Sequence, residues 1–392
     1  MRVLVSLWFI LICLPASAEP LLVDKQHFTL ESFTTFSGQT IKNVQVGWES
    51  YGKLNDDKNN VILVTHYFSG NSHAAGKYHP DDEEPGYWDA IIGPGKAIDT
   101  NKYYVLSVDT LVNLNVHHPK VITTGPATIN PDTGKPYGLD FPVVTIRDFV
   151  NVQKALLDSL GIAKLHAVIG PSMGSLQALD WATAYPERVE RMISVIGMGE
   201  TDAWSMNRLE HWANPIRLDP NWNNGDYYAK VPPKEGLHDA LTLITQDALH
   251  PQFINAMLPQ HFPIEESPLA HINNKHSSVK AFEALSAKRV NTADANHLLY
   301  LVKASQLFVA GFDKPLEQAM QTVQAKALFL PAANDLILPP YLANEAHQAL
   351  LNAGKSSDYE ELSGDMGHLN GIRYVQQAGE RIASFLAEPV NH

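Results

Sequence analysis

Short apolar runs alternate with amphipathic stretches along most of the chain. Six runs have the length and composition of buried strands, at residues 44–48, 61–64, 103–108, 165–169, 191–196 and 325–331. The clearest helical pattern covers residues 146–160, where Phe149, Leu156 and Leu160 recur at helical spacing before Gly161. Strands that alternate with helices predict an α/β fold, with a mostly parallel sheet covered by helices on both faces.

This alternation stops between residues 199 and 313, where the pattern is helical and no run resembles a parallel strand. The region is also rich in Trp, His and Asn. A helical cap of residues 199–313, lying over the carboxyl edge of the sheet and roofing a pocket, is the simplest interpretation. The core would then be built from residues 19–198 and 314–392. Its last strand, at 358–362, is short and only partly apolar and is expected near a sheet edge.

The first 18 residues have the pattern of a secretory signal peptide. A basic start is followed by an apolar run to Leu14, and small residues precede a cleavage site after Ala18. The alternative is an uncleaved anchor, but the run is shorter than the roughly 20 residues of a membrane span. A lipoprotein anchor at Cys13 is disfavoured because Ile12 is too bulky for that processing. The mature chain is therefore expected to begin at Glu19 and to be periplasmic or secreted.

Composition excludes several classes of function. The net charge is −13 and no basic cluster occurs, which disfavours nucleic acid as a partner. No stretch after the signal is apolar enough to span a bilayer. The single cysteine lies in the signal, so the mature chain has neither disulfides nor a thiol nucleophile. The acidic residues 81–84 are interpreted as a solvated loop, with a calcium site as the weaker alternative.

Gly170-Pro171-Ser172-Met173-Gly174 is a G-x-S-x-G motif between a predicted strand and a predicted helix. In that context the serine stands on a tight turn with its hydroxyl exposed at the head of a helix. The bare motif also arises by chance in glycine-rich turns. The flanking elements favour the interpretation of Ser172 as a nucleophile.

A serine nucleophile needs a base and an acid that orients the base, and in this fold they follow in the order acid, then His. Asp335 comes directly after the strand at 325–331, and His368 follows the last predicted strand. Asp335 has an alternative role as a helix N-cap. Asp365 is a weaker candidate for the acid because it lies too close in sequence to His368.

Acyl chemistry also needs two N–H donors for the oxyanion that forms in the transition state. The positions expected to supply them are Met173, after the nucleophile, and Phe68, in the loop after the third strand. His66 and His73 in that loop lack a carboxylate at ligand spacing, so neither a metal nor a cofactor is predicted.

With these residues in place, the sequence resembles the homoserine O-acetyltransferase family of α/β-hydrolases over most of its length. The resemblance rests on several segments in addition to the one around Ser172: residues 86–100, 124–148, 219–222 and 335–340. It implies an α/β-hydrolase fold with Ser172, Asp335 and His368 as the triad, and it also points to a homodimer through the helical cap.

Three departures from the family bear on the substrate. The resemblance implies an arginine for the homoserine carboxylate where this chain has Ala213, and an aspartate for the amine where it has Leu369. Residues 111–118 replace a glycine-rich family segment. Each lost charge-assisted contact is worth about 1.5–3 kcal/mol, so homoserine is not the expected acceptor. A pocket lined in this way is predicted to favour an uncharged or apolar group.

The function predicted from the sequence is that of an exported serine hydrolase that cleaves the ester, thioester or amide bond of a small acyl substrate. Export supports this prediction, because acetyl-CoA is a cytosolic metabolite. One alternative is an acyltransferase with an acyl-CoA donor. The other is a non-catalytic binding protein on the same fold, which the complete set of Ser172, Asp335 and His368 disfavours.

Overall fold

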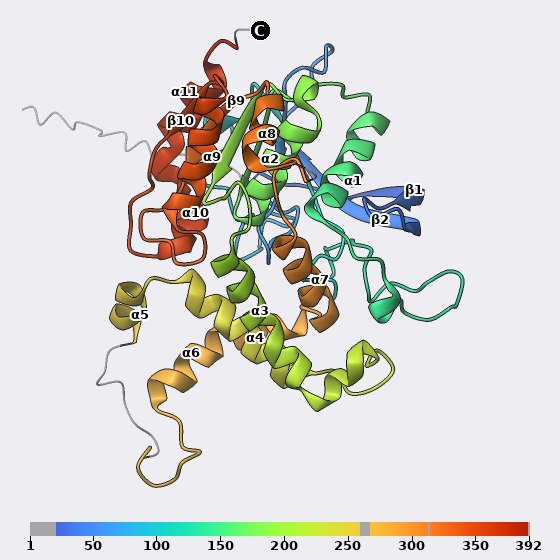
Figure 1. The fold of residues 1–392 in the computed structure, drawn as a ribbon, viewed down its shortest axis with the longest axis vertical. Coiled ribbons are helices and arrows are strands. Elements are labelled where there is room, and N and C mark those ends of the chain that lie inside the picture. The colour runs from blue at the N-terminus through green and yellow to red at the C-terminus, as the bar shows by residue number, and fades with distance from the viewer. Residues whose placement is uncertain (1–20, 259–266, 313, 391–392) are drawn as a thin grey trace, which may run out of the picture.

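An eight-stranded sheet forms the centre of the molecule (Figure 1). The computed structural model describes residues 21–258, 267–312 and 314–390, and the predicted signal at residues 1–18 lies outside them. The strands of the large sheet, in spatial order, are β1 (Gln26–Thr34), β2 (Thr40–Tyr51), β6 (Tyr104–Val108), β3 (Val61–Val64), β7 (Ala167–Pro171), β8 (Arg191–Val195), β9 (Lys326–Leu330) and β10 (Ser357–Tyr359). Two short strands, β4 (Ile92–Gly93) and β5 (Ile98–Asp99), pair separately.

The sheet is parallel from β6 to β10, and only the pairings β1–β2 and β2–β6 are antiparallel. Each predicted strand corresponds to an observed one, although β7 begins two residues later than the predicted run at 165–169. β10 lies at the sheet edge, as its partly apolar sequence indicated. β1 was not predicted, because most of its side chains are exposed and it carries little apolar signal.

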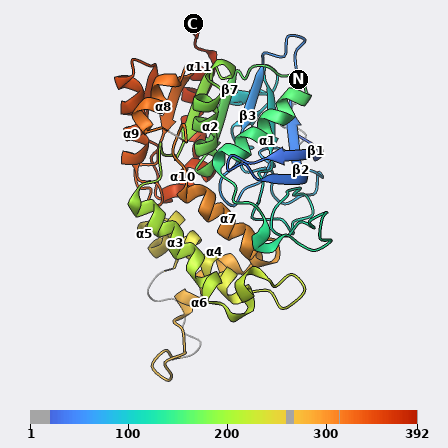
Figure 2. The ribbon, with the colours of Figure 1, turned by 45° about the vertical axis from the view of Figure 1, so that its right-hand side comes forward.

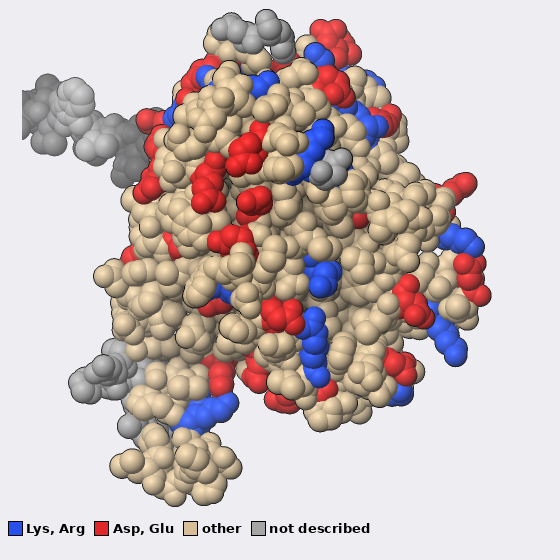
Figure 3. Space-filling view, viewed as in Figure 1, with Lys and Arg blue, Asp and Glu red and all other residues tan. Residues whose placement is uncertain are grey.

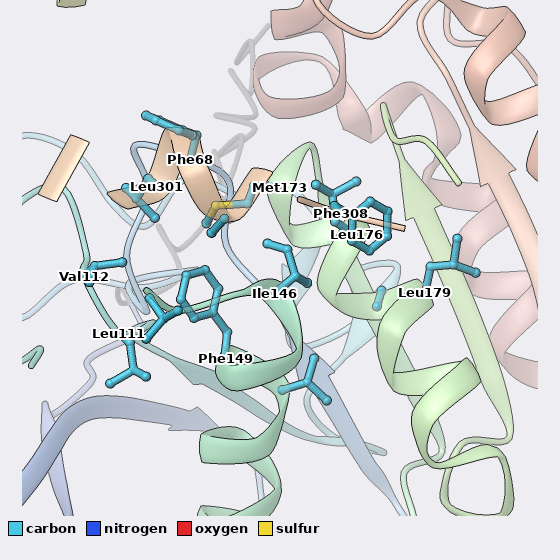
Figure 4. Close-up of a cluster of buried hydrophobic side chains, with 14 of the residues drawn as sticks. Phe68, Leu111, Val112, Ile146, Phe149, Met173, Leu176, Leu179, Leu301 and Phe308 are labelled. Atoms are coloured by element: carbon cyan, nitrogen blue, oxygen red, sulfur yellow. The ribbon is translucent and has the colours of Figure 1, made fainter. Parts of the chain in front are cut away.

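Side chains of the central strands alternate between two apolar layers, one on each face of the sheet. Val61 and Leu63 of β3 contact one layer, and Ile62 and Val64 contact the other. The first layer includes α1 (Ile146–Ser159), α2 (Met173–Ala184), α8 (Leu316–Thr322) and α9 (Pro340–Asn352); the second includes α10 (Asn370–Arg373) and α11 (Gly379–Ala387). Figure 4 shows part of the first layer, to which Phe149 of α1, Leu176 of α2 and Phe68 of the loop after β3 all contribute.

Between β8 and β9 the described chain contains helices and no named strand. The helices are α3 (Ala203–Leu218), α4 (Lys234–Ala248), α5 (Pro251–Met257), α6 (Ser277–Ala287) and α7 (Ala295–Gln306). Figures 1 and 2 show them grouped at one end of the sheet, with α7 nearest the core. They occupy the region for which a cap was predicted.

Charges of both signs are mixed on the face seen in Figure 3, and no cluster of Lys and Arg stands out there. The acidic residues Asp81, Glu83 and Glu84 are exposed, as expected of a solvated loop. Within the described residues, no helix combines the length and apolar character that crossing a membrane requires.

Candidate active site

Ser172 is held in a strained backbone conformation at the turn between β7 and α2. Its φ is 56° and its ψ is −123°, a region that residues with a side chain rarely occupy. Strain of this kind persists where the surrounding structure enforces it, and it is common at catalytic turns. The turn places Ser172 as the N-cap of α2, next to the positive end of the helix dipole.

The two glycines of the motif are required by close backbone packing. A Cβ atom added at Gly170 would lie 2.2 Å from Oγ1 of Thr65, and one at Gly174 would lie 2.2 Å from the carbonyl oxygen of Thr65. Thr65 follows β3, and its hydroxyl donates a hydrogen bond of 2.7 Å to the carbonyl of Gly174. The motif therefore joins the serine turn to the loop after β3.

Asp335, His368 and Ser172 form a continuous hydrogen-bonded chain. Nδ1 of His368 lies 2.6 Å from Oδ2 of Asp335, and Nε2 lies 2.8 Å from Oγ of Ser172. A carboxylate only accepts, so Nδ1 carries the proton and Nε2 is left to accept the serine hydroxyl proton. All three residues are buried. The geometry is that of a nucleophile, a base and an orienting acid.

The loop after β9 holds Asp335 in place. Its Oδ1 accepts hydrogen bonds from the N–H groups of Ile337 and Leu338, at 2.8 and 3.0 Å. The N-cap of the following helix α9 is Pro339, so Asp335 does not cap that helix. Asp365, the other candidate acid, is exposed, and His368 bonds to Asp335 instead.

The loop after β3 carries Phe68, and Met173, the other expected donor, is the first residue of α2. Both residues line one cavity with Ser172 and His368. Within the described part of the chain, neither N–H donates to a protein acceptor. Two free donors beside the serine are what an oxyanion hole needs.

Buried hydrogen bonds fix the loop that carries Phe68. His66 is fully buried; its Nε2 accepts from the N–H of Thr110 at 3.1 Å, and its Nδ1 donates to the carbonyl of Tyr67 at 2.8 Å. Burial lowers the pKa of His66, which keeps the ring neutral. Both ring nitrogens are therefore used to shape the loop.

A buried charge cluster anchors the far end of this loop. Glu49 of β2 is fully buried and accepts from His73 at 3.0 Å, from Tyr78 at 2.5 Å and from the ammonium of Lys25 at 2.8 Å. Burial alone would raise the pKa of Glu49. The hydrogen bond from His73 and the charge of Lys25 outweigh it and lower the pKa to about 2.

Glu49→Gln is expected to destabilise the protein by about 3 kcal/mol at pH 7, because it leaves Lys25 buried without its main partner. A carboxyl with a lowered pKa stabilises the fold above pH 4.5 and loses that effect as the pH falls towards 2. The difference between wild type and variant in urea unfolding should therefore shrink below pH 4.5. Glu187→Gln, at an exposed position, is the control. Equal stability of Glu49→Gln and wild type at pH 7 would contradict the expectation.

The cavity beside Ser172 has a volume of about 160 Å³ and lies between the core and the cap. An apolar cavity of roughly 150 Å³ can hold a molecule the size of benzene. The core contributes Ser172, His368 and the loop after β3, whereas α3, α4 and α7 contribute from the cap. Most of the lining side chains are apolar: Phe68, Met173, Leu176, Met198, Leu209, Trp212, Ile244, Ala248, Ile337, Leu338, Leu369 and Ile372.

The comparisons with known proteins fit this architecture. Residues 123–372 match the family model described as alpha/beta hydrolase fold. Homoserine O-acetyltransferases of Methanococcoides burtonii and Deferribacter desulfuricans are each 37% identical to this chain. Both alignments cover 88% of it, and they cover 70% and 91% of the two relatives, respectively. The chain belongs to the homoserine O-acetyltransferase family.

Two solved structures resemble this member of the family closely. Esterase E22 is 60% identical, with a TM-score of 0.91 over 93% of this chain and 100% of that chain. A homoserine O-acetyltransferase from Bacillus anthracis is 39% identical, with a TM-score of 0.91 over 95% of this chain and 99% of that chain. The protein is thus an acyl-transferring enzyme on the α/β-hydrolase fold.

One segment of the family resemblance has a structural role in the cap. Asp219 caps the turn after α3 by accepting from the N–H groups of Asn221 and Gly236, at 2.8 and 2.9 Å. The indole N–H of Trp222 donates to Asn296 of α7 at 2.9 Å. The segment 219–222 therefore links α3, α4 and α7, which together roof the cavity.

The two substitutions relative to the family differ in their surroundings. Leu369 follows His368 directly and lines the cavity with an apolar side chain. Ala213 is fully buried on α3, beside Trp212, and does not itself line the cavity. The position where the family resemblance implies an amine-binding aspartate is therefore apolar in this chain, and it lines the cavity.

The lining of the cavity also contains cations. Two arginines that the sequence analysis did not single out, Arg208 of α3 and Arg289 of the cap, line the cavity. Arg208 lies 3.2 Å from Asp247, which neutralises it. Arg289 has no such partner in the described chain.

Proposed function

We propose that this protein is a serine acyl hydrolase that cleaves a small ester, thioester or amide through an acyl-serine intermediate. The observation that carries the proposal is the hydrogen-bonded chain from Asp335 through His368 to Ser172, which ends at a mostly apolar cavity. A hydroxyl so paired can lose its proton as it attacks a carbonyl carbon.

In the first half of the reaction, Oγ of Ser172 bonds to the carbonyl carbon while Nε2 of His368 takes the serine proton. The carbonyl oxygen becomes an oxyanion, which accepts hydrogen bonds from the N–H groups of Phe68 and Met173. Asp335 stabilises the imidazolium and keeps its orientation. The tetrahedral intermediate then collapses, and His368 gives its proton to the leaving group.

In the second half, a water molecule attacks the acyl carbon of the acyl-serine, and Nε2 of His368 takes a proton from that water. The same two N–H groups stabilise the second oxyanion. Breaking of the bond to Oγ releases the carboxylic acid, and the proton on His368 returns to Ser172. Atoms and protons balance with water as the only co-reactant.

Water is favoured over an amine-bearing acceptor because the residue next to His368 is apolar. Leu369 lies beside the base, where the resemblance implies an aspartate that binds an amine acceptor. No acidic side chain is among the described residues that line the cavity. The 60% identity to esterase E22 supports the same proposal.

The family membership favours acyl transfer from an acyl-CoA as the second candidate. The two activities differ in their products, because a transferase releases free CoA only when an acceptor is present. A hydrolase releases the thiol from a thioester without any acceptor.

The direct test is a panel of 4-nitrophenyl esters and acyl thioesters of increasing chain length. A cavity of about 160 Å³ should accept short acyl groups, so we expect turnover to be highest for acetyl to butyryl and to fall for long chains. Absence of turnover on every ester and thioester, by protein shown to be folded, would overturn the proposal.

We also propose that the protein is exported to the periplasm or secreted. The prediction rests on the basic start, the apolar run and the small residues before Glu19. N-terminal sequencing of protein expressed in its natural host should find Glu19 as the first residue in the extracytoplasmic fraction. Soluble cytosolic protein with an intact Met1 would contradict export and strengthen the acyl-CoA alternative.

A further inference from the structure

Arg289 is a cation at the roof of the cavity whose floor holds Ser172 and His368. It lies in the short 3-10 helix Lys288–Asn291, which follows α6 in the cap. The side chain is partly buried and lines the cavity. The reaction proposed above makes no use of it.

Arg289 differs from every other arginine that the structure describes, because it has no acidic partner. The other seven each pair with a carboxylate: Arg147 with Asp180, Arg188 with Asp158, Arg191 with Glu190, Arg208 with Asp247, Arg217 with Glu210, Arg373 with Glu84 and Arg381 with Asp358. In a chain with net charge −13, an arginine left without an acid is unexpected.

Few of the hydrogen-bonding groups of Arg289 are used. A guanidinium has five N–H donors, and within the described chain one of them bonds, from Nη1 to Oγ1 of Thr245 at 3.1 Å. Thr245 also lines the cavity and donates its own proton to the carbonyl of Leu241 at 2.8 Å. Thr245 thus holds one arm of the guanidinium and leaves the remaining donors available.

The electrostatics of this corner favour an anion. Burial lowers the pKa of Arg289. An arginine nevertheless keeps its charge in proteins, and no carboxylate of the described chain offsets the free-energy cost of removing this guanidinium from water. Tyr67 lines the same cavity, and no protein partner of its hydroxyl is found among the described residues. Burial raises the pKa of Tyr67, which keeps it a neutral hydrogen-bond donor. An anion here would meet a free cation and a free hydroxyl, and no acidic residue.

We propose that Arg289 is a specificity-determining residue that binds a carboxylate carried by the substrate, so that the preferred substrate is a small ester with one free acid group. The planar guanidinium can bind a carboxylate through two parallel hydrogen bonds. This inference rests on the proposed hydrolase function and narrows its substrate class. The carboxylate can belong to the acyl part or to the alcohol part of the ester.

Two matched pairs of esters test the inference and distinguish the two positions of the carboxylate. Monoethyl glutarate against ethyl pentanoate probes the acyl part, and 4-acetoxybutanoate against butyl acetate probes the alcohol part. Acid release is followed in a pH-stat. For wild type we expect kcat/KM to be about 10- to 100-fold higher for the anionic member of one pair, which is the range of a charge-assisted hydrogen bond.

Arg289→Met removes the charge and keeps much of the length of the side chain. It should bring that ratio close to one, mainly by raising KM for the anionic ester, and Arg289→Lys should restore part of the preference. Arg217→Met is the control, because Arg217 pairs with Glu210 on the outside of the cap and does not line the cavity. It should keep the wild-type ratio.

Inhibition of wild type gives a measurement that does not depend on any variant folding. Glutarate should inhibit hydrolysis of a neutral ester competitively, and at least tenfold more strongly than neutral glutaramide. Equal kcat/KM within both pairs together with no preference for glutarate would overturn the inference while leaving the hydrolase intact. Failure of wild type to hydrolyse any ester, anionic or neutral, would instead overturn the proposed function.

Discussion

Ser172→Ala is expected to lower kcat for ester hydrolysis by about four to six orders of magnitude, the range seen when a triad serine is lost. The substitution removes the Oγ that lies 2.8 Å from Nε2 of His368, so no acyl-serine can form. Labelling of the protein by a fluorophosphonate should disappear at the same time, because that reagent bonds to an activated serine hydroxyl. Steady-state kinetics and gel fluorescence measure the two effects.

The matched control for this experiment is Ser384→Ala, at an exposed position of α11. It should retain wild-type turnover and labelling. Thermal unfolding of Ser172→Ala should resemble that of wild type, since the Cβ atom is kept and the hydroxyl is the only group lost. Labelling that persists in Ser172→Ala would place the reactive serine elsewhere and refute the mechanism.

The residues around Ser172 could be predicted because each depends on local chain geometry. A G-x-S-x-G motif needs a strand before it and a helix after it, and the apolar pattern indicates both. Asp335 and His368 follow the last two predicted strands, and parallel strands bring their carboxyl ends to the same edge of the sheet. Order along the chain was therefore enough to bring these side chains together.

A helical roof could be predicted, but the side chains that line it could not, since they depend on how the cap helices cross. Arg289 lies 117 positions from Ser172 (289 − 172), and no repeat or strand order relates the two. It stands out because the described residues give it no acidic partner, which only the fold reveals. β1 was missed for another reason: it is an edge strand whose stability comes from pairing with β2 rather than from apolar burial.

Acceptor choice is where family membership and the residues of this chain point in different directions. Homoserine carries an ammonium and a carboxylate on the same carbon. Arg289 could receive the carboxylate, but the described residues that line the cavity include no acid for the ammonium. Placing an unpaired charge in a largely apolar cavity costs several kcal/mol. We therefore expect this site to reject the ammonium rather than the carboxylate.

We accordingly expect no detectable transfer of an acetyl group from acetyl-CoA to L-homoserine, alongside measurable hydrolysis of a simple neutral ester. Leu369→Asp places a carboxylate at the cavity beside His368 and should give weak homoserine-dependent release of CoA. Adding Ala213→Arg should contribute less than the family pattern implies, because Ala213 is fully buried on α3 and an arginine there must displace its neighbours. Free thiol is followed with and without homoserine, and Ser172→Ala sets the background. Homoserine-dependent thiol release by wild type, absent in Ser172→Ala, would show that other residues bind the ammonium and that the protein is an acetyltransferase.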